Sequence, residues 1–545
     1  MQITCLGATR TVTGSSFLVE LDDQTCFLVD CGLFQGGRQI EQRNWDISDH
    51  RPQDIKAIYI THAHIDHSGL VPRLTRQGYN GPIYATKATS ELLKILWLDS
   101  AHIQQMEAQW QSRKNKRVGR KDIEPLYETV DAEAAIALIR PVEMNAPLEL
   151  IPGVTSTFVS AGHILGAASL HLSLQAADGA HNVGFSGDVG RQKQLIVPDP
   201  EIMPRVDTLF METTYGQRLH KSIADSEKEL MDVITQAFKE GGRVVIPSFA
   251  VERTQELIYV MAQAYRDGKW PGEMPVYLDS PLAIKATQIF RDHPEFFDDE
   301  TKAILDSGQR PLNFPFLTPT PSTQESQAIN DKKGPMVIIA GNGMSTAGRI
   351  KHHLKHNLWR SDCHVVIVGF QAQGSTGRQL VDGADTVKIF REDVEVRAKI
   401  HTIGGFSAHA DQAELLTWLE PQIHDGLCVN LIHGEELQSL GFAKVAQKRF
   451  PNAHFHVPKW KEVIRVTPFA EVAPLPVEEF PEPAARLAMP QRRAMVAEVR
   501  QLRDRLDEVM LEILTGERDL DQRQIEALRQ VVEGAEAALA QWEAA

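Results

Sequence analysis

T-H-A-H-I-D-H-S-G, residues 61–69, is the stretch that decides how the rest of this sequence is interpreted. It follows A-I-Y-I, residues 57–60, a short apolar run rich in strand-forming residues. We expect a buried strand that ends here and releases its polar residues into a loop. Two histidines two positions apart can point the same way while the chain is extended, and the Asp-His pair after the turn can face a second metal. Four potential ligands lie within six residues: His62, His64, Asp66 and His67.

The side chains of this loop suit a metal ion. Neutral imidazole together with carboxylate binds zinc, and also iron or manganese. The alternative is a polar loop whose histidines are merely hydrogen-bonded, but chance seldom packs three histidines and one aspartate so tightly after a strand. The sequence therefore predicts a metal centre at the end of this strand.

Other motifs follow in a fixed order along the chain. They are Asp30 in F-L-V-D-C-G, His163 in S-A-G-H-I-L-G-A, Asp188 in G-F-S-G-D, Glu212 in M-E-T-T-Y-G and His409 in G-F-S-A-H-A-D. Together with H-A-H-I-D-H, this series resembles the metallo-β-lactamase superfamily and its nucleic-acid-processing β-CASP branch. The resemblance covers roughly residues 1–470, and the order of its motifs makes it highly specific.

The resemblance implies an α/β protein, a metallo-β-lactamase αββα sandwich with an inserted, doubly wound β-CASP domain. Strands and helices alternate from about residue 215 to 395, which by itself indicates a parallel sheet. The expected strands of that sheet are residues 243–247, 276–278, 336–340 and 365–368. We assign the sandwich to residues 1–214 and 396–470, the β-CASP domain to 215–395, a Pro- and Glu-rich linker to 471–484, and a helical hairpin to 485–545.

The last segment carries two heptad stripes of apolar residues, with Gly516 between them. This pattern predicts an antiparallel helical hairpin outside the family core. The hairpin can pair with another subunit or dock on its own chain, and we predict a contribution to a homo-oligomer. The stripes are Met495, Val499, Leu502, Leu506, Val509 and Ile513, then Ile525, Leu528, Val532, Ala535, Leu539 and Trp542.

Composition is that of an ordinary globular protein: 545 residues, 42% hydrophobic and 24% charged. No apolar run approaches the roughly 18 residues needed to cross a membrane, and the N-terminus lacks the pattern of a signal peptide. The five cysteines form no C-x-x-C pair and suit reduced thiols, so we expect a cytoplasmic protein. The net charge of −15 is unusual for a nucleic-acid enzyme, although a local basic groove matters more than the total.

The resemblance also implies a site for two metal ions per chain, with zinc expected and manganese or iron as alternatives. One metal takes His62, His64 and His163, the other takes Asp66, His67 and His409, and Asp188 bridges them. The residues expected to carry catalysis are Asp66, Asp188, Glu212 and His409. Glu212 would orient a histidine such as His409, Asp30 would support the ligand loop through hydrogen bonds, and His433 is expected to be structural.

Phosphate contacts are expected on the inserted domain. G-N-G-M-S-T-A-G-R, residues 341–349, lies between an expected strand and an expected helix, where free backbone N–H groups suit a phosphate. Gly-rich turns are common, so the resemblance gives this signal most of its weight. The basic run at residues 113–121 is either a solvated loop or a rim that contacts phosphates. The expected substrate-binding residues are Ser248, Arg253, Ser345, Arg349 and Arg378.

The function implied by the resemblance is that of a zinc-dependent ribonuclease that binds single-stranded RNA. It would cleave phosphodiester bonds with a metal-activated hydroxide and leave a 5′-phosphate and a 3′-hydroxyl. One departure concerns the acid that protonates the leaving oxygen. Related nucleases carry a further histidine for this step where the present sequence has Gln379, so His352, His353 or a metal-bound water would have to substitute.

Two other functions stay open. The acidic charge and the missing histidine are consistent with a metallo-hydrolase of a different substrate, a thioester or a small phosphodiester. A non-catalytic scaffold is the third reading, and the intact set of metal ligands argues against it.

Overall fold

The computed structural model describes residues 1–176, 179–369, 371–372 and 374–466. The chain separates into two compact units, Met1–Pro474 and Leu475–Ala545, and the described residues belong to the first. The predicted linker at 471–484, the predicted hairpin at 485–545 and its heptad stripes therefore lie outside the described residues. Among the helices that are described, none is long and apolar enough to cross a membrane.

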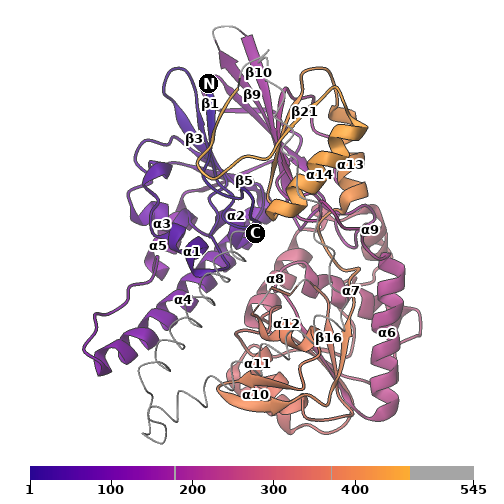
Figure 1. Cartoon of the computed structure of the whole chain (residues 1–545). Coiled ribbons are helices and arrows are strands. Elements are labelled where there is room, and N and C mark those ends of the chain that lie inside the picture. The colour runs from indigo at the N-terminus through magenta and orange to yellow at the C-terminus, as the bar shows by residue number, and fades with distance from the viewer. Residues whose placement is uncertain (177–178, 370, 373, 467–545) are drawn as a thin grey trace, which may run out of the picture. The chain divides into compact units, whose positions relative to one another are not determined.

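Two seven-stranded sheets pack face to face (Figure 1). The first sheet has the order β22 (Val463–Arg465), β1 (Gln2–Cys5), β2 (Phe17–Glu20), β3 (Cys26–Val29), β4 (Ile58–Tyr59), β5 (Ile83–Thr86) and β6 (Ile139–Val142). The second has the order β21 (His454–His456), β20 (Cys428–Ile432), β11 (Thr208–Glu212), β10 (Gly179–Phe185), β9 (Ala168–Ala176), β8 (Val154–Ser160) and β7 (Leu148–Ile151).

The core of this sandwich is made by side chains that alternate along the strands and point between the sheets. Phe17 of the first sheet lies 5.4 Å from Phe185 of the second, and Phe185 stacks on Phe210 at 4.8 Å between ring centroids. Helices bury their apolar faces against the two outer surfaces, which completes the predicted αββα arrangement. They are α1 (Arg38–Glu41), α2 (Ile65–Ser68), α3 (Val71–Arg76), α4 (Lys87–Arg117) and α5 (Thr129–Ala137), then α13 (Gln412–Leu419) and α14 (Glu436–Arg449).

The third sheet belongs to the insertion, and all of its strand pairs are parallel. Its order is β14 (Leu317–Pro319), β13 (Val276–Asp279), β15 (Met336–Ala340), β12 (Arg243–Pro247), β16 (His364–Ile367) and β19 (Lys399–Thr402). The helices that accompany it are α6 (Ile223–Glu240), α7 (Arg253–Arg266), α8 (Pro281–Asp292), α9 (Asp299–Asp306), α10 (Thr323–Asp331), α11 (Ile350–Asn357) and α12 (Thr376–Val381), with a hairpin of β17 (Thr386–Ile389) and β18 (Glu392–Glu395).

Strand β12 shows why this sheet is doubly wound. Its residues are all buried, with Val244 and Ile246 packing in one apolar cluster and Val245 in another. Helices α6 and α7 contribute to the first cluster and α11 to the second, so both faces of the strand are covered. One boundary differs from the prediction, because β19 pairs with β16 and extends the inserted sheet beyond residue 395.

Helix α6, the first helix of the insertion, illustrates how local sequence sets these elements. The Ser222 hydroxyl caps its N-terminus by accepting from the Asp225 amide, and Gly241 ends it in the left-handed conformation at φ 71°. Leu230, Ile234 and their neighbours recur every three or four residues and are buried. Inserted helices and strands group apart from those of the sandwich in Figure 1.

Candidate metal centre

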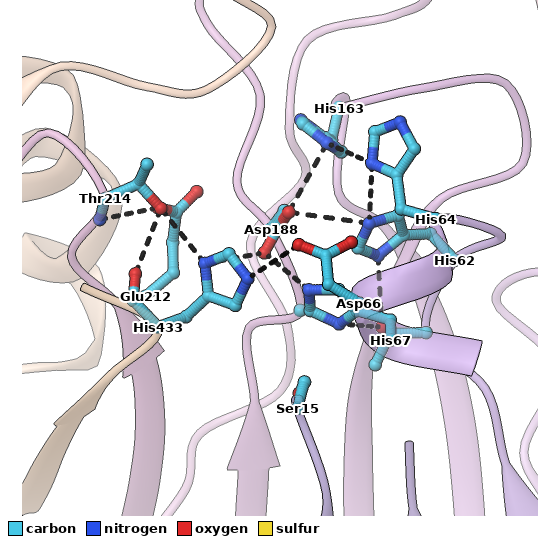
Figure 2. Close-up of polar contacts among 12 residues, drawn as sticks. Ser15, His62, His64, Asp66, His67, His163, Asp188, Glu212, Thr214 and His433 are labelled. Carbon is cyan, nitrogen blue, oxygen red and sulfur yellow. Dashed lines mark hydrogen bonds and ion pairs between the residues drawn. The ribbon is translucent and has the colours of Figure 1, made fainter. Parts of the chain in front are cut away.

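The metal-ligand residues meet because several buried strands end at the same edge of the sandwich. Strands β10, β11 and β20 are parallel neighbours, with Phe185 opposite Phe210 and Glu212 opposite Ile432. The residues directly after them therefore lie side by side, and the loop that begins at Thr61 after β4 faces them across the sandwich. Figure 2 shows the resulting cluster of imidazole and carboxylate groups around Asp188.

One group consists of His62, His64, His163 and Asp188. His64 Nδ1 lies 3.1 Å from His62 Nε2 and 3.3 Å from His163 Nε2. Asp188 Oδ2 lies 3.4 Å from both His62 Nε2 and His163 Nε2. Ligands about 2.0–2.1 Å from a tetrahedral metal are separated by about 3.3 Å, so these four side chains fit one cation.

A second group consists of Asp66, His67 and His433, with the other oxygen of Asp188 beside it. His67 Nε2 lies 3.2 Å from Asp188 Oδ1, and His433 Nε2 lies 3.6 Å from Asp66 Oδ2. Among the described residues, His67 Nε2, Asp188 Oδ1 and His433 Nε2 are buried atoms with no hydrogen-bond partner. Buried polar atoms seldom stay unpaired, so their convergence fits a second cation.

The pKa shifts of most of these residues agree with ligation. His67 differs, because burial would lower its pKa but Asp188 and Asp30 outweigh that effect and raise it well above the usual range, so a cation bound there would displace its proton. Burial holds the pKa values of His62 and His163 well below the usual range, which keeps these imidazoles neutral with a lone pair available. Burial would raise the pKa of Asp66, but the neighbouring His433 and His67 lower it to about 2. The pKa of Asp188 also lies well below its ordinary value because neighbouring histidines outweigh its burial. The carboxylates are therefore ionised, as metal ligands must be.

Asp30 supports this loop in the way that the resemblance implies. Its carboxylate accepts from the Thr61 amide at 2.9 Å and from the hydroxyl groups of Thr61 and Ser15. Its Oδ2 lies 2.7 Å from His67 Nδ1, which leaves Nε2 of that ring to face Asp188. A carboxylate on the far nitrogen of a ligating histidine fixes both the tautomer and the ring orientation.

The structure differs from the sequence expectation in which histidine joins Asp66 and His67. We expected His409 there and a structural role for His433, but His433 occupies that position. His433 directly follows strand β20, and the Thr214 hydroxyl holds its Nδ1 at 3.0 Å. The sequence contains a signal that we did not use, since L-I-H-G repeats the arrangement of an apolar strand followed at once by histidine.

His409 pairs instead with Glu212. Its Nδ1 lies 3.1 Å from Glu212 Oε1, whereas the Asp188 carboxylate is 3.9 Å away. Glu212 is fully buried and also accepts from the backbone amides of Val189 and Thr214, so its oxygens are engaged within the protein. Glu212 therefore orients His409, as the resemblance implies, and the ring of His409 keeps its Nε2 for another partner.

Comparison with known proteins identifies the family. Residues 9–248 match the metallo-beta-lactamase superfamily, residues 254–380 the Beta-Casp domain, and residues 393–458 the Zn-dependent metallo-hydrolase RNA specificity domain. Ribonuclease TTHA0252 of Thermus thermophilus is 36% identical over 449 residues, which is 82% of this chain and 96% of that protein. The chain belongs to the β-CASP branch of the metallo-β-lactamase superfamily.

Archaeal relatives of this β-CASP protein carry a different name. Transcription termination factor FttA of Methanocaldococcus jannaschii is 30% identical over 475 residues, covering 86% of this chain and 72% of that protein. FttA of Thermococcus kodakarensis is 32% identical over 467 residues, covering 83% of this chain and 69% of that protein. The similarity spans the sandwich and the inserted domain alike.

Arg349, expected to bind phosphate in this β-CASP protein, has a different role in the structure. Its guanidinium donates to Asp279 Oδ1 at 2.8 Å and to the backbone carbonyls of Thr320 and Pro321 at 2.7 and 2.9 Å. Asp279 is fully buried and also contacts His353 Nε2 at 2.6 Å. Arg349 is therefore committed to holding the inserted domain together, and His353, a suggested substitute acid, is buried in the same network.

Arg349→Ala is expected to destabilise the inserted domain by about 3 kcal/mol, because it leaves the buried Asp279 without its cation. Arg378→Ala is the matched control. Arg378 pairs with Asp382 one helical turn away on the surface, and loss of such a pair costs less than about 0.5 kcal/mol. Thermal melting of both variants measures the difference. An Arg349→Ala protein that melts like the parent but binds RNA less tightly would restore the phosphate role.

The other expected substrate contacts lie at the ends of strands in the inserted sheet. Ser248 follows β12, is buried, and its hydroxyl accepts from Thr254 at 3.0 Å. Arg253 begins α7 and lies 3.4 Å from Glu256. Ser345 follows β15, is fully buried, and its hydroxyl has no hydrogen-bond partner among the described residues. The Ser345 hydroxyl is therefore available for a hydrogen bond within the Gly-rich turn that was expected to receive a phosphate.

Proposed function

We propose that this chain is a metal-dependent ribonuclease that cleaves single-stranded RNA at a site for two zinc ions. The observation that carries the proposal is the position of Asp188, whose two oxygens face two separate groups of ligands. His62, His64 and His163 would hold one ion, and the other ligand set is Asp66, His67 and His433, with Asp188 shared. Two such cations activate a water molecule and offset the charge that develops on a phosphate under attack.

His409 is the proposed general acid. It lies beside both ligand groups, and it is paired with Glu212, whose carboxylate accepts from backbone amides. Burial alone would lower the pKa of His409, but Glu212 and Asp188 raise it to about 9. Glu212 is not one of the proposed metal ligands and stays beside the ring, so we assign the proton to His409, with Nδ1–H donating to Glu212. A proton on Nε2 can be given to the 3′ oxygen that leaves, so the products are a 3′-hydroxyl and a 5′-phosphate.

This assignment removes the need for a histidine near Gln379. Gln379 lies on α12, distant in sequence from the ligand loops. The structure offers His409, from the segment after β19, as the acid candidate. The departure from related nucleases that we noted in the sequence therefore does not weaken the proposal. RNA as the substrate is supported by the name of the bacterial relative and by the RNA specificity domain matched at residues 393–458.

The test is an assay of the purified, zinc-loaded protein on single-stranded RNA labelled at either end, with 5′-phosphate and 5′-hydroxyl versions. We expect cleavage that chelation abolishes and zinc restores, with new 5′-phosphate ends. Thioester and small phosphodiester substrates are assayed in parallel. Turnover of those compounds with no cleavage of RNA would contradict the proposal and favour the rival metallo-hydrolase.

Several finer points stay predictions. Zinc as the ion and two ions per chain are expected from the ligand types, and elemental analysis of protein purified without chelator measures both. Cytoplasmic location and self-association through residues 485–545 rest on the sequence alone.

A further inference from the structure

Glu252 is a buried residue in a backbone conformation that costs energy. It lies in the turn between β12 and α7 at φ 65° and ψ −66°, and its side chain is 2% exposed. Positive φ is the region that glycine tolerates and that a side chain with a Cβ disfavours. Strain of this kind persists where the surrounding structure imposes it, often at a functional site.

The Glu252 carboxyl group contacts the loop that carries His163. Glu252 Oε2 accepts a hydrogen bond from the backbone amide of Leu165 at 3.2 Å, and Leu165 is two residues beyond His163. On the other side, Gln194 Nε2 donates to the backbone carbonyl of His163 at 2.9 Å. Glu252 and Gln194 thus hold two backbone groups of the His163 loop, one from the inserted domain and one from the sandwich, while Thr86 and Thr89 hold the Gly166 carbonyl further along.

His163 is carried by a different loop from the other two histidines of its group. His62 and His64 belong to one short loop that Asp30 fixes through Thr61. His163 follows β8, and among the residues that the structure describes the Ala408 carbonyl, at 3.3 Å, is the partner of its Nδ1. A small shift of this loop would therefore move His163 away from the other ligands of the first group and would leave the second group intact.

The carboxyl group of Glu252 is suited to accept a hydrogen bond in its neutral, protonated form. Burial, and then the neighbouring Glu256, raise the pKa of Glu252 well above the usual carboxyl range. Glutamine at this position would keep the shape and an oxygen that can accept from Leu165. Methionine would keep the length and the backbone strain but would provide no comparable acceptor.

We propose that Glu252 is a positioning residue through which the inserted domain holds the His163 loop, so that binding of one of the two metals depends on the seating of that domain. The inference rests on the metal centre of the proposed function. It adds a residue that is neither a ligand nor in contact with the reacting atoms. Loss of a hydrogen bond that supports a ligand typically lowers metal affinity 10- to 100-fold.

The test compares zinc release from the full-length parent, Glu252→Gln and Glu252→Met after mixing with an excess of chromophoric chelator. We expect Glu252→Met to release one of its two ions at least about tenfold faster and the other at the parent rate. Glu252→Gln should stay within about threefold of the parent. Glu256→Gln, a buried carboxyl one helical turn along α7, is the matched control and should also behave like the parent.

Amide hydrogen exchange over residues 160–167 provides a second measurement, and exchange there should accelerate in the methionine variant alone. If that variant does not fold, Glu252→Gly, which has no strain at positive φ, takes its place. Parent-like zinc release from a folded methionine or glycine variant would overturn the inference, as would equally fast release from Glu252→Gln. Zinc release is measured without RNA, so a protein that binds zinc and never cleaves RNA contradicts the proposed nuclease function alone.

Discussion

His409→Ala is expected to lower kcat for RNA cleavage by about 10²–10⁴-fold while both metal ions stay bound. The reason is its position, with Nδ1 held by Glu212 and the Asp188 carboxylate 3.9 Å away. Removing the imidazole takes away the proton donor for the leaving oxygen but leaves both ligand groups complete. The affinity for RNA should change little, because a general acid acts on the transition state more than on the bound substrate.

The pH dependence of kcat tests the same assignment. The pKa of His409 is raised to about 9 chiefly by Glu212 and Asp188, acting against burial, so the acid form is present below that pH and is lost as pH rises through it. Glu212→Gln removes one of these carboxylates, and the alkaline limb of the profile should move to lower pH. Elemental analysis is the control. A His409→Ala protein that has lost a metal ion would show that His409 is a ligand, as the sequence had suggested.

Asp188→Ala is expected to lose both metal ions and to reduce RNA cleavage about 10³-fold or more. Asp188 Oδ2 faces His62 and His163, whereas Oδ1 faces His67, so one substitution removes a ligand from each group.

His433→Ala is the comparison that separates the two sites. It removes a ligand from the group of Asp66 and His67 only, so one ion should be lost and one retained. Zinc content is measured on all three proteins after desalting. We expect two ions in the parent, one in His433→Ala and none in Asp188→Ala. Retention of two ions by Asp188→Ala would rule out a shared carboxylate, and full zinc content in His433→Ala would exclude that residue as a ligand.

The family and the sandwich were predicted by the sequence itself, which also named most of the side chains that the structure brings together around Asp188. Local order explains this, because several motifs consist of a buried strand with polar residues shortly after it, as in Ile58–Tyr59 before the 61–69 loop. The strands of the insertion were equally clear, and residues 243–247 and 336–340 form strands with the predicted bounds. Such patterns depend on neighbours in the chain, so they can be identified without knowledge of the fold.

The positions of His409 and His433 relative to Asp66 and His67 were decided only by the tertiary structure. Both histidines follow the insertion, and either could have returned to Asp66 and His67. Pairing of β20 with β11 brings His433 to the ligand edge, whereas the backbone of His409 bridges to Gly190 and presents its ring to Glu212.

The partners of Arg349 were likewise decided by the tertiary structure. In the structure its guanidinium donates hydrogen bonds to Asp279, Thr320 and Pro321, which are far from it in the chain. Which partner a charged or ligating side chain meets depends on how strands from distant segments are arranged side by side, and short sequence motifs do not contain that information.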